Sequence, residues 1–192
     1  MEYRIRKAKE SEKLQIARTI AHSFEDDFFS LTKDTDRVAK VFENGLDANR
    51  FLVAEQADKI IGIICCENCT DRVLRMSRIN CIRHFGFIRG YIAFKVFAEE
   101  FMEPLAYPPT TGRIAIVGVL EEARGQGVAK AMLKEIIAHN PQYSEFILDV
   151  TDINATAIKL YEKFGFVEYD RIPYKWAKQA GFNAKIWMKY VR

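Results

Sequence analysis

A short loop with two glycines carries the groups best suited to hold a phosphate. The loop, residues 124–129, has the sequence Arg-Gly-Gln-Gly-Val-Ala and follows the β-branched segment 114–119. From Val128 onward, apolar residues recur at the spacing of a helix face. Gly125 and Gly127 allow the backbone to turn tightly, and free N–H groups at a helix start attract anions. The sequence therefore predicts that a strand, this loop and a helix start together bind a diphosphate.

Three loop patterns bind a diphosphate in this way, and the sequence fits one of them. A Walker loop ends in Gly-Lys-Ser or Gly-Lys-Thr, which is absent here. A dinucleotide-binding loop requires glycine where Lys130 stands, and no suitable first strand opens the chain. The third pattern, typical of acyl-coenzyme A binding, is Gln or Arg, any two residues, Gly, any residue, then Gly or Ala. Residues 124–129 satisfy every position of it.

A second element, residues 154–166, places an amide and a phenol two helical turns apart on one face. It begins at Asn154, contains Tyr161 and has the sequence N-A-T-A-I-K-L-Y-E-K-F-G-F. With the glycine loop upstream and one strand between them, the pair resembles the two signatures of the GNAT N-acetyltransferase superfamily. The resemblance covers most of the chain. It fails at residues 71–112, where such domains often pass directly from the third strand to the fourth.

The resemblance implies an α/β (α+β) fold in a single domain of residues 1–192. We expect a mixed, mostly antiparallel twisted sheet of about seven strands, flanked by helices and splayed between strands four and five. The fourth strand would be residues 114–119 and the fifth residues 146–150. Residues 71–106 would form a helical insertion before the fourth strand.

The same resemblance implies acetyl-CoA as co-substrate and no metal. Main-chain groups at the edge of the fourth strand would bind the pantetheine arm as an added strand. Loop N–H groups would cradle the diphosphate, while Arg124 would set the loop or face a phosphate. Asn154 would contact pantetheine, and Tyr161 would protonate the departing thiolate as general acid. The expected binding residues are Val117, Val119, Arg124, Gly125, Gln126, Gly127, Val128, Ala129, Lys130, Asn154 and Tyr161.

Two of these residues have plainer interpretations. Tyr161 could be an amphipathic tyrosine that only packs, and Asn154 could be only a helix N-cap. Asn154 could also serve both roles. The sequence leaves these alternatives open.

The acceptor would be a primary amine of a small molecule or peptide that attacks the acetyl carbonyl directly. Such amines are protonated at neutral pH, so a base or a chain of waters must remove a proton. The candidate bases are His84, Glu121, Glu122 and Asp149. None stands out, and positioning alone could supply much of the rate. The alternative function is therefore a GNAT-fold module that binds acyl-CoA, or senses it, without transferring the acyl group.

The other elements follow from periodicity and capping residues. Ser11 and Asp36 are expected to cap the first two helices. Residues 72–84 and 87–102 are expected to form two helices, and Gly165 to end the helix of residues 154–164 in a left-handed conformation. Strands are expected at residues 3–7, 51–55, 59–66, 166–171 and 184–190.

The composition excludes several classes of protein. The 192 residues carry a net charge of +3, and 49% are hydrophobic, as in ordinary soluble domains. No apolar run approaches the ~20 residues of a membrane span, and the first residues lack the apolar core of a signal peptide. We therefore expect a cytoplasmic protein with no membrane partner. The arginines of residues 72–83 alternate with apolar residues, which argues against a nucleic-acid partner.

The four cysteines favour structural thiols. Cys66 and Cys69 have C-x-x-C spacing, but no second ligand pair lies at a zinc-site distance in the sequence. Asn68 and Thr70 place the pair in a turn rather than at the helix start that a redox motif would require.

The identity of the acceptor is not readable from the sequence. Three segments, residues 24–29, 71–102 and 174–176, are expected to shape its site. The aromatic insertion favours an apolar-walled pocket, although core packing explains the same residues equally well. A homodimer is left open.

Overall fold

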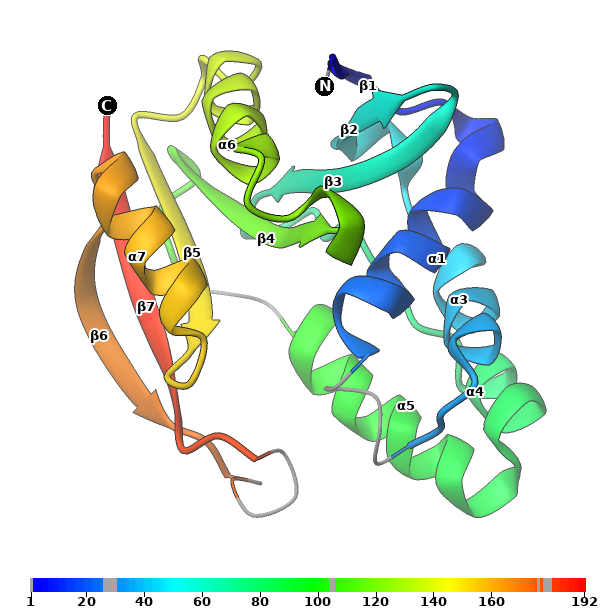
Figure 1. Cartoon of the computed structure of the whole chain (residues 1–192). Coiled ribbons are helices and arrows are strands. Elements are labelled where there is room, and N and C mark those ends of the chain that lie inside the picture. The colour runs from blue at the N-terminus through cyan, green and yellow to red at the C-terminus, as the bar shows by residue number, and fades with distance from the viewer. Residues whose placement is uncertain (1, 26–30, 104–105, 176, 178–180) are drawn as a thin grey trace.

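A seven-stranded sheet with the order β1-β2-β3-β4-β5-β7-β6 runs through the molecule and separates two layers of helices (Figure 1). We analysed a computed structural model, which describes residues 2–25, 31–103, 106–175, 177 and 181–192. Neighbouring strands are antiparallel except β4 and β5. The strands are β1 Arg4–Lys7, β2 Phe51–Gln56, β3 Lys59–Glu67, β4 Thr111–Val119, β5 Glu145–Thr151, β6 Val167–Pro173 and β7 Ala184–Val191. The predicted fold class is confirmed.

Helices cover both faces of the sheet and enclose two cores. One core joins β2, β3 and β4 to α1, α3, α4 and α5, with Phe42, Phe51 and Leu74 fully buried in it. The other lies between the sheet and α6 and α7, with Met132, Leu133 and Phe146 fully buried. The helices are α1 Lys13–Ser23, α3 Thr35–Glu43, α4 Arg78–Phe85, α5 Phe87–Phe101, α6 Val128–Ala138 and α7 Ala155–Phe164.

The sheet divides into two leaves between β4 and β5. These strands pair only at Thr111, Gly112 and Arg113 of β4, whereas β3 pairs with β4 as far as Val119. The register between β3 and β4 shifts at Ala115, so β4 carries a bulge just beyond the last pair with β5. A bulge bends its strand and increases the local twist. Beyond Arg113, the β5-β7-β6 leaf therefore turns away from β4, as Figure 1 shows.

The insertion before β4 begins differently from the prediction. The expected helix over residues 72–84 is wrong in its first half, because α4 begins only at Arg78, with the Ser77 hydroxyl as its N-cap. The preceding segment is extended. The Val73 N–H donates to Glu67, and the Arg75 N–H donates to the Gly45 carbonyl, both at 2.9–3.0 Å. These tertiary hydrogen bonds replace the helical ones that the periodicity indicated.

Two predicted caps are also wrong, while the predicted end of α7 is confirmed. Ser11 lies within a 3₁₀ turn that precedes α1, and no side chain caps that helix. The cap of α3 is Asp34 rather than Asp36, since its carboxylate accepts from the Arg37 N–H at 3.2 Å. Gly165 ends α7 with φ = 113°, in the left-handed region that glycine favours.

Candidate active site

The glycine loop joins β4 to α6 through a 3₁₀ turn, Glu121–Ala123. Gly125 and Gly127 have φ of 76° and 79°, and no atom lies within 4 Å of the place where a Cβ would stand on either. The positive φ angles require glycine, and the open space leaves the main chain accessible to a ligand. Two side chains fix the loop from within. Arg124 Nε donates to the Val119 carbonyl at 3.2 Å, and Gln126 Nε2 donates to the Glu122 carbonyl at 2.9 Å. The Arg124 contact is compatible with the first of its two expected roles, setting the loop.

The start of α6 presents unsatisfied main-chain donors beside this loop. The first helical hydrogen bond runs from the Ala131 N–H to the Gly127 carbonyl at 3.0 Å. The N–H groups of Val128, Ala129 and Lys130 therefore precede the ladder and have no acceptor within the helix. With the positive end of the helix dipole, they form a donor set that fits a diphosphate. Lys130 is exposed at the same end and adds a positive charge.

Among the described residues, no strand pairs with the β5-facing edge of β4 beyond Arg113. Val117 and Val119 lie on this stretch, and their half-buried side chains pack against the α6–α7 core. Main-chain groups on an open strand edge can pair with an extended ligand as they would with another strand. The edge leads directly into the glycine loop, so one extended molecule could contact both.

Asn154 and Tyr161 lie at opposite ends of α7. Asn154 Oδ1 accepts from the Ala157 N–H at 3.1 Å, so Asn154 is an N-cap, and the cap leaves its amide donors unused. Tyr161 is only 7% exposed, and its ring packs against Phe166 with centroids 5.9 Å apart. Burial and the nearby Asp149 carboxylate raise the pKa of the Tyr161 phenol well above its ordinary value. The phenol is therefore protonated at neutral pH and could donate its proton.

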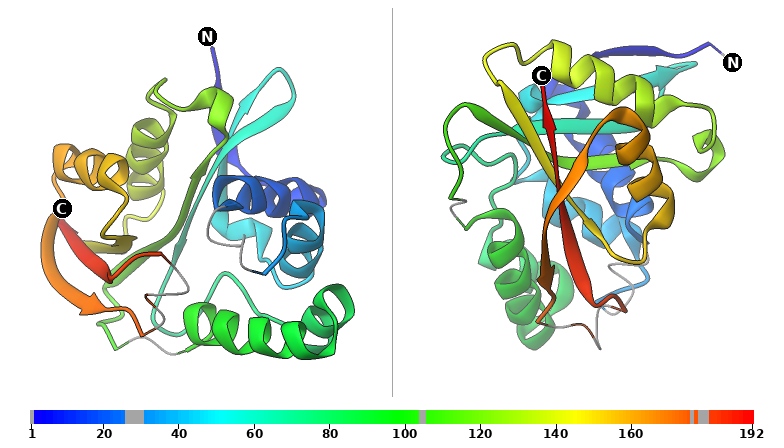
Figure 2. Two further views of the ribbon diagram at one scale, coloured as in Figure 1. Left: turned by 60° about the horizontal axis from the view of Figure 1, so that its bottom comes forward. Right: turned by 90° about the vertical axis from the view of Figure 1, so that its left-hand side faces the viewer.

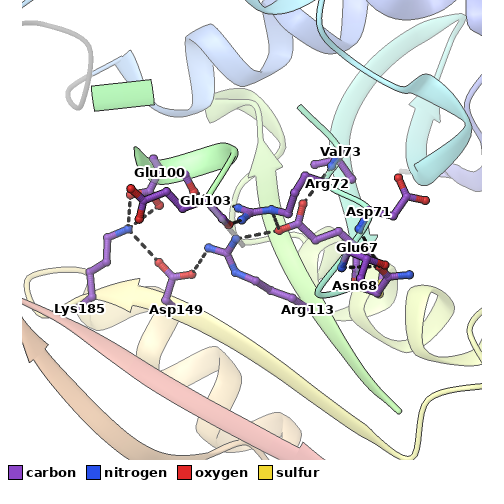
Figure 3. A network of polar contacts seen from close by, with 12 residues as sticks. Glu67, Asn68, Asp71, Arg72, Val73, Glu100, Glu103, Arg113, Asp149 and Lys185 are labelled. Carbon is purple, nitrogen blue, oxygen red and sulfur yellow. Dashed lines mark hydrogen bonds and ion pairs between the residues drawn. The ribbon is translucent and has the colours of Figure 1, made fainter. Parts of the chain in front are cut away.

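A buried ionic network lies where β4 and β5 begin to separate (Figure 3). Arg113, the last β4 residue paired with β5, bonds to Glu67 at 2.8 Å and to Asp149 at 2.6 Å. All three side chains are nearly or fully buried, and the Arg113 guanidinium lies 5.5 Å from the centre of the Trp187 ring. The network bridges β3, β4 and β5 where the two leaves separate.

The same network ties the insertion to both leaves. Lys185 of β7 contacts Asp149 at 3.2 Å and Glu100 of α5 at 2.5 Å. Arg72 lies 2.8 Å from Glu67 and donates to the main-chain carbonyls of Glu100 and Glu103. Three cations and three carboxylates thus compensate one another across the β4–β5 junction, as Figure 3 shows. Of these six residues, only Asp149 is among the candidate site residues predicted from the sequence. For Glu67 and Arg113 the sequence offers one signal, because each is a charged residue that borders an apolar strand segment.

Two of the four candidate bases are held in ion pairs. Asp149 is held by Arg113 and Lys185, which keep the pKa of its carboxyl well below the usual range despite burial. Glu122 pairs with Lys59 at 2.5 Å. His84 is on α4, where burial and the cations Lys40, Arg83 and Arg37 lower the pKa of its imidazole. Glu121 is exposed at the start of the 3₁₀ turn.

The cysteines and the acidic residues form no metal site in the part of the chain that is described, which contains no group of three or more potential ligands. Burial raises the pKa of Cys66 to about 12, which makes it an inert thiol. None of the helices formed by the described residues is both long and apolar enough to span a bilayer. Residues 26–29 and Trp176, which are parts of the segments 24–29 and 174–176 expected to shape the acceptor site, lie outside the described residues.

Comparison with known proteins decides the family. Residues 17–166 match the family model described as the Acetyltransferase (GNAT) family. The chain belongs to the GNAT acetyltransferase family. A curated relative, human N-acetyltransferase 8B, is 40% identical over 52 residues, which are 26% of this chain and 23% of the length of that protein. This GNAT chain thus aligns with about a quarter of its curated relative.

Solved structures confirm the GNAT fold over nearly the whole chain. An N-acetyltransferase from Staphylococcus aureus Mu50 has a TM-score of 0.65 at 18% identity, covering 97% of this chain and 100% of its own. The protein yncA from Salmonella typhimurium, solved with its cofactor acetyl-CoA, has a TM-score of 0.63 at 16% identity, covering 98% and 93%. The ribosomal-protein-S18-alanine N-acetyltransferase from Escherichia coli has a TM-score of 0.59 at 14% identity, covering 99% and 94%.

Proposed function

We propose that this GNAT protein transfers an acetyl group from acetyl-CoA to a primary amine of a small molecule or peptide. The observation that carries the proposal is the continuity of the open β4 edge, the two positive-φ glycines and the unpaired N–H groups that begin α6. Acetyl-CoA would supply an activated thioester, whose carbonyl carbon an amine can attack directly.

In this proposal, main-chain groups bind acetyl-CoA at its diphosphate and along its pantetheine arm. The N–H groups of Val128, Ala129 and Lys130, with the main chain of Gly125–Gly127, bind the diphosphate. The edge of β4 at Val117 and Val119 binds the pantetheine arm, and the free amide donors of Asn154 contact it from α7. Main-chain donors fixed by secondary structure need no reorganisation on binding, which favours affinity and orientation.

Tyr161 acts as the general acid. The amine nitrogen forms a bond to the carbonyl carbon, the carbon–sulfur bond breaks, and the phenol gives its proton to the departing sulfur. The raised pKa of Tyr161 means that its phenol is protonated at neutral pH and is a weaker acid than a free tyrosine. The amine loses a proton to water or to Glu121, since Asp149 and Glu122 are already held in ion pairs. Solvent then returns a proton to Tyr161.

The occupied carboxylates favour a second candidate, a module that binds acyl-CoA without transferring the acyl group. A panel of amines and peptides, with free coenzyme A as the readout, separates the two. Sustained release of coenzyme A with any acceptor, above the rate without acceptor, supports the transferase. Stoichiometric acetyl-CoA binding without release across the panel supports the binding module and contradicts transfer.

A further inference from the structure

The outer face of the α4–α5 hairpin is apolar although it faces solvent. Phe87 and Ile88, which follow the Gly86 turn between the two helices, are 78% and 73% exposed. Ile79 on α4 and Ile92 on α5 are more than half exposed, and Tyr91 nearly so. The opposite face of α5 is buried, because Gly90, Ala93 and Phe97 pack into the core. The exposed stripe is therefore a second apolar face on a helix that is already anchored.

The same segment is strongly basic. Residues 72–98 contain five arginines and one lysine and no Asp or Glu. Arg75, Arg78, Arg83, Arg89 and Lys95 are exposed, and none of the ion pairs between described residues includes them. Arg83, Arg89 and Lys95 lie on the two helices that present the apolar stripe.

We infer that the α4–α5 hairpin docks on the surface of an anionic lipid bilayer. An exposed apolar helix face bordered by arginine and lysine is the pattern of helices that lie in the plane of a membrane interface. Phe87, Ile88 and Ile92 would enter the boundary between headgroups and acyl chains. The cations would contact lipid phosphates and strengthen the attraction to an anionic surface. This mode needs no spanning helix, and it departs from the expectation of no membrane partner that the sequence supported.

The charge pattern distinguishes this partner from others. A second copy of the chain, paired through the same face, would bring two sets of like charges together, and of the two acids on α5, Glu99 and Glu100, the second already pairs with Lys185. A nucleic acid would use the cations but would leave Phe87, Ile88 and Ile92 exposed or pressed against phosphates. An anionic bilayer satisfies both the apolar stripe and its basic border.

The orientation would leave the candidate active site free. The hairpin lies at the end of the molecule away from α6, as Figure 1 shows, and Figure 2 shows α4 and α5 along one outer edge. Docking there keeps the glycine loop facing water. The inference does not depend on acetyl transfer, and it would hold if the protein only bound acyl-CoA.

Vesicle co-sedimentation tests the inference directly. We expect the full chain to bind vesicles containing about a third phosphatidylserine at least tenfold more strongly than pure phosphatidylcholine vesicles, and less strongly at high salt. A Phe87→Ser, Ile88→Ser variant and an Arg83→Gln, Arg89→Gln, Lys95→Gln variant should each lose about tenfold or more of this binding. Matched controls on the far side are Val167→Ser, which removes an apolar side chain 68% exposed on β6, and Lys134→Gln, Lys159→Gln, Lys163→Gln. Both controls should bind as wild type.

A second variant keeps the test independent of folding. Phe87→Trp adds an indole at the proposed insertion point, and its emission should be quenched by brominated lipids only in anionic vesicles. Equal binding to neutral and anionic vesicles, or no quenching, overturns the inference. The inference is also overturned if light scattering shows a dimer that the Phe87→Ser substitution dissociates, and the protein does not bind vesicles. Retention on nucleic acid that needs Arg83 and Arg89 but not Phe87, again without vesicle binding, also overturns it.

Discussion

The two regions of the molecule on either side of Arg113 along β4 differ in whether their polar groups are already paired. Beyond Arg113, the candidate acetyl-CoA site consists of main-chain N–H groups that have no hydrogen-bond partner among the described residues. Before it, the junction with the insertion consists of charged side chains that are buried and held in ion pairs, such as Arg113, Glu67 and Asp149. The open groups can bind a ligand without first breaking an interaction. The closed ones stabilise the junction and would have to lose partners to bind anything.

This contrast predicts that substitutions in the two regions have different effects. Changes in the glycine loop should alter ligand binding with modest effects on stability, whereas changes in the ionic network should alter stability first. The following experiments test the contrast, beginning with the largest expected effect.

Removing Arg113 should destabilise the fold strongly. Arg113→Ala leaves two buried carboxylates without their shared cation, which typically costs about 3–5 kcal/mol of the free energy of unfolding. Arg171→Ala is the matched control, since its ion pair with Glu168 is about half exposed and should be worth less than about 1 kcal/mol. Urea unfolding of both variants measures the difference. Equal losses would contradict the view that the network is a buried structural junction.

Replacing Gly127 should abolish donor binding while sparing the fold. Gly127→Val places a β-branched residue at φ = 79° and fills the open space beside the N–H groups. We expect acetyl-CoA affinity to fall by more than about a hundredfold, since charge-assisted hydrogen bonds are each worth roughly 1.5–3 kcal/mol. Gly86→Val is the control, because it has φ = 82° and equally open surroundings but lies in the α4–α5 turn. If both variants bind acetyl-CoA alike, the loop is not the diphosphate site.

Removing the Tyr161 hydroxyl should slow turnover more than it weakens binding. Loss of a general acid typically costs about a hundredfold or more in kcat, while the packed ring remains. Tyr161→Phe should therefore lower kcat and leave the KM for acetyl-CoA within a few fold. Tyr190→Phe is the control, since its ring packs on the same Phe166 at 5.5 Å. Indistinguishable kcat values for the two variants would leave Tyr161 with only a packing role.

Acidification should weaken the junction through Asp149. Its cationic neighbours lower the folded-state pKa of this carboxyl, so its contribution to stability is present above the unfolded pKa of about 4 and is lost as pH falls below it. Wild type should lose stability between neutral pH and about pH 3, and Asp149→Asn should lose less over that range. Urea midpoints measured across this pH range give both slopes. Equal slopes of stability against pH for wild type and Asp149→Asn would mean that Asp149 does not cause the loss of stability in acid.

The same contrast explains what could be predicted from the sequence. The glycine loop was predictable because positive φ angles demand Gly125 and Gly127, and because consecutive residues make the site. The end of α7 at Gly165 was predictable for the same reason. The ionic network was not, since Glu67, Arg113 and Lys185 are far apart in the chain and meet only in the folded sheet. The extended start of the insertion was also missed, because tertiary hydrogen bonds to Glu67 and Gly45 outweigh the helical periodicity of residues 72–77.

The most direct test of the account is a calorimetric comparison of acetyl-CoA with acetyl-pantetheine, which has the same thioester and arm but lacks the diphosphate. If main-chain donors of the loop and α6 hold the diphosphate, acetyl-CoA should bind with one-to-one stoichiometry and at least about a hundredfold more tightly. Equal affinities for the two compounds, or no binding of acetyl-CoA at millimolar concentration, would contradict it.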